Sequence, residues 1–229
     1  MRRSDVWLAG FVGVVLVAVA PALVFARSSN GSSPYLNAFS HISVLSTTIP
    51  PPIGDLNPYG VAVVPRTVGS LTQGNVLVSN FNASSNLQGT GTTIMQIAPN
   101  GTFHRFAHIT GALPGACPGG VGLTTALVVL RQGWVIVGSL PTTNGMAATA
   151  RAGCLLVLDS GGHVRETIAG GGINGPWDMT AQDNGNSAVL FVTNVLNGTV
   201  AAGGAVVNRG TVLRIALSVS GGTPPSVTG

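Results

Sequence analysis

The chain has 229 residues, of which 45% are hydrophobic and only 7% are charged, and it contains 33 glycines and 14 prolines. Few charges and many turn-forming residues are typical of strands joined by turns, and they exclude a bundle of exposed helices. All ten cations are arginine, so chemistry that requires lysine, such as a Schiff base or a Gly-Lys phosphate loop, is excluded. The arginines form no basic stripe, and we therefore predict no nucleic-acid partner.

Residues 1–26 have the pattern of an export signal. Arg2 and Arg3 give a positive start, an apolar stretch runs from Val6 to Phe25, and the small residue Ala26 is suited to cleavage. The apolar stretch is also long enough to span a bilayer, so anchoring through residues 6–25 is the alternative. Polar residues 27–40 are predicted to form a flexible linker. The protein is thus expected to be secreted or extracytoplasmic, or else membrane-anchored.

The chain contains two cysteines, Cys117 and Cys154. In an oxidising compartment they form the one available disulfide pair, and such a bridge would stabilise the fold by about 3 to 4 kcal/mol in the chain-entropy model. Two unpaired buried thiols are the alternative. A structural zinc site needs more ligands than these two thiols provide.

Three landmarks recur along the chain after residue 50. The first is a turn with a proline before a short strand, and these prolines lie 60 and 58 residues apart, at Pro58, Pro118 and Pro176. The second is a run rich in β-branched residues, found at 74–80, 133–139 and 187–194. The third is a glycine followed by another strand, at Gly91, Gly153 and Gly210. The order of the landmarks is the same in each unit, which indicates a structural repeat.

A fourth strand is predicted after an acidic or amide turn, at 99–106 and 159–166. Four short strands in a repeated unit are typical of a β-propeller blade, which buries its faces only against neighbouring blades. We therefore predict an all-β fold, a partial ring of about three four-stranded antiparallel blades. The predicted blades cover about 57–110, 117–170 and 175–229. Each unit is longer than a compact blade, and the excess lies in loops such as 81–89 and 141–152.

The motif Pro-x-Gly-Val, the run from Gly74 to Asn80, the following glycine-led strand and the Asn-Gly turn together resemble the NHL-repeat family. The streptogramin-lyase-like and SMP-30/gluconolactonase-like propellers are related to it, and the resemblance covers 41–220. NHL repeats favour Tyr-Val-Ala-Asp at the end of the second strand, whereas this chain has Val78-Ser79-Asn80, so the acidic residue is missing there. The resemblance implies a binding or scaffold module. Its enzymatic relatives imply the alternative, a lyase or lactonase that uses a divalent metal such as calcium in the central channel.

The predicted ring is incomplete. Residues 41–49 are expected to form a strand that closes the last blade, while the third unit has no predicted fourth strand before Gly229. Three blades are fewer than the four to eight of a closed propeller. We therefore expect a fragment of a longer ring or two copies that complete one, and open blade edges would allow self-association.

No serine-hydrolase elbow, zinc-protease motif or Cys-x-x-Cys occurs, so no catalytic residue and no metal ligand is assigned. The glycines at 170, 172 and 175 match a dinucleotide-binding spacing, but a proline and a strand follow where a helix is needed, so we predict a turn. The candidate ligand-binding residues would line one face of the central channel and contact a ligand by stacking and hydrogen bonding: Asp178, Trp177, Tyr59, Asn80 and Asn194. The alternative is that Asp178 and the asparagines cap turns. The ligand or protein partner is not specified by these residues.

Overall fold

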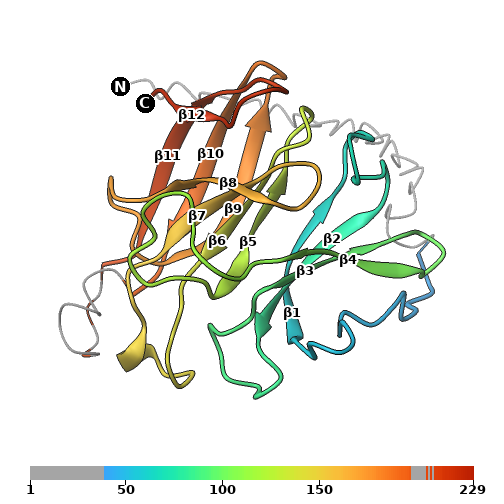
Figure 1. Ribbon diagram of the computed structural model, residues 1–229, viewed down its shortest axis with the longest axis horizontal. Helices are drawn as coiled ribbons and strands as arrows, with labels where there is room; N and C mark the ends of the chain where they lie inside the picture. Colours follow the sequence, from blue (N-terminus) through green and yellow to red (C-terminus); the bar gives the residue numbers. More distant parts are fainter. Residues whose placement is uncertain (1–38, 197–204, 206, 208) are drawn as a thin grey trace, which may run out of the picture. The chain divides into compact units, whose positions relative to one another are not determined.

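The computed structural model describes residues 39–196, 205, 207 and 209–229, and the predicted signal at 1–26 lies outside this part of the chain. All the strands lie in one unit, Val44–Gly229, and form three four-stranded antiparallel sheets in simple chain order (Figure 1). The first sheet contains β1 (Leu56–Val63), β2 (Val76–Asn82), β3 (Thr93–Ile97) and β4 (Phe103–His108). The second contains β5 (Leu123–Val129), β6 (Val135–Ser139), β7 (Cys154–Leu158) and β8 (Val164–Ile168). The third contains β9 (Pro176–Asp183), β10 (Ser187–Asn194), β11 (Thr211–Ser218) and β12 (Ser226–Val227).

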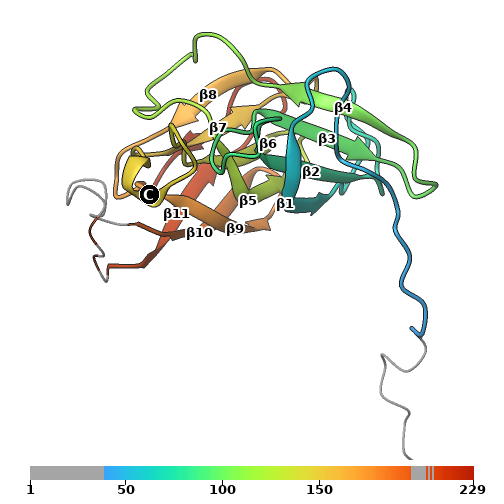
Figure 2. The same ribbon diagram turned by 90° about the horizontal axis from the view of Figure 1, so that it is seen from below.

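The second sheet packs between the other two. Every residue of β6 and β7 is buried, and alternate side chains point into two separate cores because successive residues of a strand face opposite sides of the sheet. Val135 and Val137 belong to the core shared with the first sheet, whereas Ile136 belongs to the core shared with the third. The innermost strands β1, β5 and β9 lie next to one another in the same order (Figure 2). The all-β prediction is therefore confirmed, and the fold is β-propeller-like.

The strand register corrects the first landmark of the repeat. In the first and third sheets, Asn80 of β2 lies opposite Pro58 and Asn194 of β10 lies opposite Pro176, so these two pairs are equivalent. In the second sheet, however, Ser139 lies opposite Leu123. Pro118 precedes β5 and is not the structural counterpart of the other two prolines. The proline spacing looked regular because the segment that enters β5 carries its own proline turn.

Two further expectations about the ends of the repeat were wrong. The third sheet does have a fourth strand, β12, which pairs with β11 through Leu217↔Val227 and Ser218↔Ser226. It is short because Pro224 and Pro225 precede it and have no N–H to donate to a ladder. Residues 41–49, although all described, belong to no strand. Within it, Ser46 and Thr48 are joined to the first sheet by single hydrogen bonds, from Ser46 Oγ to the Gly101 carbonyl at 2.9 Å and from Asn80 Nδ2 to the Thr48 carbonyl at 2.7 Å.

Cys117 and Cys154 form a disulfide, as the first of the two sequence readings predicted. The bridge spans 37 positions of sequence, and the Cα atoms are 5.2 Å apart. Cys154 is the first residue of β7 and is fully buried, whereas Cys117 lies in the segment that leads into β5. The bridge therefore fastens this long connection to the centre of the second sheet.

The surroundings of Gly91 and Gly153, two glycines of the third landmark, explain why glycine is needed at these positions. At Gly153 an added Cβ would lie 1.9 Å from the carbonyl oxygen of Ser139, and at Gly91 it would lie 2.1 Å from that of Asn80. The backbone that enters the third strand therefore passes directly against the end of the second strand. At Gly210 the equivalent distance, to the carbonyl oxygen of Asn194, is 3.9 Å, which is an ordinary contact.

This difference provides a test of the close approach. We expect Gly153→Ala to destabilise the protein by about 2 kcal/mol or more, because backbone atoms have to move to admit the methyl group. Gly210→Ala is the matched control and should leave stability unchanged or slightly raised. Urea unfolding followed by circular dichroism measures both. Equal stabilities for the two variants would contradict the packing described for the second and third strands.

Candidate binding pocket

Two aromatic residues project from irregularities in the innermost strands. The register of β1 against β2 shifts between Pro58 and Gly60, and that of β9 against β10 shifts between Asn194 and Thr193. Tyr59 and Trp177 are the extra residues at these two β-bulges. A bulge redirects a side chain out of the regular alternation of the strand. Both aromatic side chains can therefore turn toward the ends of the sheets.

The two redirected rings meet Phe81, which is almost fully buried at the end of β2. Tyr59 stacks on Phe81 with ring centroids 4.5 Å apart, and Trp177 packs edge-on against Phe81 at 5.4 Å and against Tyr59 at 5.8 Å. Edge-to-face and stacked contacts at these distances are favourable for aromatic pairs. The cluster joins the first sheet to the third, although the second sheet lies between them in the chain.

Hydroxyl groups of β5 hold the backbone of Trp177 in place. Thr124 Oγ1 donates a hydrogen bond of 2.8 Å to the Pro176 carbonyl, and Thr125 Oγ1 donates to the Trp177 carbonyl. The first sheet is attached in the same way, because Ser79 Oγ donates to the Thr124 carbonyl at 2.7 Å. A short series of Ser and Thr hydroxyls thus connects all three sheets beside the aromatic cluster.

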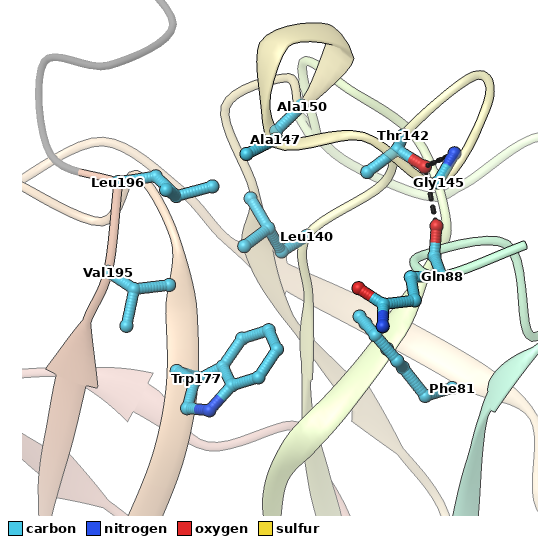
Figure 3. A pocket seen from close by; sticks show the side chains of 10 residues that line it. All are labelled: Phe81, Gln88, Leu140, Thr142, Gly145, Ala147, Ala150, Trp177, Val195 and Leu196. Atoms are coloured by element: carbon cyan, nitrogen blue, oxygen red, sulfur yellow. Dashed lines mark hydrogen bonds between the residues drawn. The ribbon is translucent and has the colours of Figure 1, made fainter. Parts of the chain in front are cut away.

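A pocket of about 270 Å³ opens next to Phe81 and Trp177 (Figure 3). Three lining residues occupy equivalent positions in the three sheets, each one place after the equivalent residue of its second strand (Asn80, Ser139 or Asn194). They are Phe81, Leu140 and Val195. The rest of the lining is provided by Gln88, Thr142, Gly145, Ala147, Ala150, Trp177 and Leu196. The pocket is therefore mainly apolar and lies where the ends of the three sheets converge.

The two loops that make the units longer than compact blades form one side of this pocket. Thr142 Oγ1 donates to the Gln88 carbonyl at 2.5 Å, and the Thr142 N–H donates to the Gly89 carbonyl at 3.0 Å. The 141–152 loop also contains a short 3-10 turn, η2 (Ala147–Thr149), which is fixed by Asn144 through a 2.6 Å hydrogen bond from Thr149 Oγ1. These loops are thus tied to each other beside the pocket.

The asparagines among the candidate residues are buried and bind backbone. Asn194 Oδ1 accepts hydrogen bonds from the N–H groups of Asn174 and Gly175, at 3.1 and 3.2 Å. Ser139, at the equivalent position, accepts from the Gly122 N–H at 2.9 Å. Asn80 donates to Thr48 and to Thr93. In each sheet, therefore, this position holds the segment that leads into the innermost strand.

Asp178 lies beside Trp177 in the sequence but is exposed, and its carboxylate accepts a hydrogen bond of 2.9 Å from the Met179 N–H. Of the five candidate residues, Trp177 alone lines the pocket, and Tyr59 contacts the Trp177 ring from outside the lining. Asp178 and the two asparagines also lie outside the lining. Sequence reasoning missed Phe81, Leu140 and Val195. Each directly follows the second landmark of its unit, and this shared position was the signal that could have identified them.

The charged groups of the described residues lie outside the pocket lining. Asp159, in the turn before β8, binds Arg165 Nε at 2.6 Å. Partial burial would raise the pKa of this carboxyl group, but hydrogen bonds from the His163 and Gly161 N–H groups and from Arg165 outweigh it and hold the pKa below its ordinary value. Over the described part of the chain, no three His, Cys, Asp or Glu side chains are grouped so as to hold a metal ion.

No family model matches the sequence, and no curated protein does. Among solved structures, the chain is similar to two variants of the apocarotenoid oxygenase of Synechocystis. The TM-scores are 0.43 and 0.42, with 10% and 9% sequence identity, and each alignment covers 76% of this chain. The chain spans only 39% and 38% of those two structures. In the described residues, no helix has the length and apolar character needed to cross a membrane.

The structural role of Asn194 can be tested by comparison with an exposed neighbour. Asn194→Ala should lower the free energy of unfolding by about 1 to 3 kcal/mol, because the buried Gly175 N–H loses its side-chain acceptor. Thr180→Ala, at an exposed position of β9, should cost less than about 0.5 kcal/mol. Chemical denaturation measures both values. An Asn194→Ala protein as stable as the parent would show that this side chain does not hold the entry to β9.

Proposed function

We propose that this protein is an exported binding module of the NHL-like β-propeller type, without catalysis, and that its ligand binds in the apolar pocket beside Trp177. The observation that carries the proposal is the pocket itself, which joins equivalent positions of all three sheets to an aromatic cluster. Binding sites are concave and mainly apolar, with few polar groups, and they are commonly formed where structural units meet.

Several features of the chain support this reading. The pocket is held by hydroxyls, backbone groups and packed rings, so it is formed before any ligand arrives. A preformed site loses less conformational entropy when it binds. Export is supported by the disulfide, since such bridges persist in oxidising compartments, and by the signal-like pattern of residues 1–26.

The proposal can be tested with 2-naphthol as an aromatic probe and the full-length chain. Titration followed by NMR should perturb the indole N–H resonance of Trp177. Trp177→Leu should weaken binding about tenfold, because one aromatic face of the pocket is lost. Phe191→Leu is the matched control, since Phe191 is an aromatic residue of β10 that is 38% exposed and does not line the pocket.

We expect the control to bind like the parent protein. The proposal fails if 2-naphthol leaves the Trp177 resonance unchanged at saturating concentration, or if both variants lose affinity equally. The second outcome would place the probe on exposed apolar surface and not in the pocket.

A further inference from the structure

The electrostatic character of the pocket limits what it can bind. Its ten lining residues include no Asp, Glu, Arg, Lys or His. An ion that entered it would lose hydration without gaining a counter-charge, and burial of an unpaired charge is strongly unfavourable. The lining therefore provides no counter-charge for a charged ligand.

The lining contains three residues with polar side-chain groups, Gln88, Thr142 and Trp177. The Thr142 hydroxyl donates to the Gln88 carbonyl and accepts from the Gly145 N–H at 2.9 Å, so it has little capacity left for a ligand. The Gln88 side-chain amide and the Trp177 indole N–H differ, because neither makes a hydrogen bond to any described residue. In Figure 3 the Gln88 amide points into the space between Thr142 and Trp177. A ligand in the pocket would thus meet two unpaired polar side-chain groups, of which the Gln88 amide can both donate and accept a hydrogen bond, whereas the Trp177 indole N–H can only donate.

The volume of the pocket indicates the size of the group that it can enclose. A cavity of about 150 Å³ is large enough to hold benzene. The pocket here, at about 270 Å³, is less than twice that volume. Its aromatic wall favours a flat partner, because a planar ring system can pack against the Trp177 and Phe81 rings.

From these observations we infer that the pocket selects uncharged, planar, mainly apolar molecules of about two fused rings that carry one hydrogen-bonding group, and that Gln88 is the residue that recognises this group. The inference rests on the proposed binding function and adds the chemical class of the ligand. It also assigns a specificity-determining role to a loop residue that no sequence motif marks.

The experiment compares three probes of the same ring size with the full-length chain at neutral pH: 2-naphthol, naphthalene and 2-naphthoate. We expect 2-naphthol to bind most tightly and the carboxylate to bind at least about tenfold more weakly, because its charge has no partner in the pocket. Gln88→Leu should weaken 2-naphthol about 2- to 10-fold while leaving naphthalene unchanged or slightly tighter. Gln182→Leu, on an exposed position of β9, is the matched control and should change none of the three affinities.

The possible outcomes distinguish a failure of the proposed binding function from a failure of the proposed ligand class. If no probe binds, the proposed function and the ligand class both fail. If 2-naphthoate binds as tightly as 2-naphthol, the binding function stands and the preference for uncharged ligands is overturned. If Gln88→Leu reduces naphthalene and 2-naphthol affinity equally, Gln88 acts on pocket shape and the recognition role is wrong. Thermal melts of both variants check folding, and the exposed position of Gln88 makes an intact fold the expected result.

Discussion

The structure depends on the burial of both faces of the second sheet. Strands β6 and β7 have no exposed residue, and their side chains alternate between two cores. A four-stranded sheet of this kind cannot be stable alone, since each apolar face has to be covered by another sheet. The second sheet therefore fixes the positions of the first and third sheets. Consequently, the equivalent ends of the three second strands meet around one pocket.

Hydroxyl groups make most of the side-chain hydrogen bonds between the sheets, and one carboxylate, that of Asp183 at the end of β9, accepts from the Arg131 N–H at 2.6 Å. The Ser79 hydroxyl binds the first sheet to β5, and the Thr124 hydroxyl binds β5 to β9. This choice agrees with a composition that is only 7% charged. Neutral hydrogen bonds satisfy buried backbone groups without the desolvation cost of an ion pair. The pocket lining likewise contains no charged residue.

The sequence predicted the features that depend on local pattern. Alternation, turn residues and glycine spacing located the three sheets, and the glycine landmark reflects a real backbone contact between the second and third strands. Features that depend on tertiary register were not predictable. Pro118 lies in a turn that resembles the turn at Pro58. The pairing of β5 with β6, however, shows that Leu123 is the residue equivalent to Pro58. Asn80 and Asn194 were grouped correctly as equivalent residues, yet the backbone groups that they bind lie in segments distant from them in sequence.

The first and third sheets meet at the aromatic cluster beside the pocket. Nuclear Overhauser spectroscopy on the full-length protein tests this contact directly, because the Trp177 ring lies 5.4 Å from the Phe81 ring and 5.8 Å from the Tyr59 ring, measured between centroids. The account predicts cross-peaks from the indole protons of Trp177 to the ring protons of both residues. Cross-peaks from Trp177 to residues of the third sheet alone would contradict it.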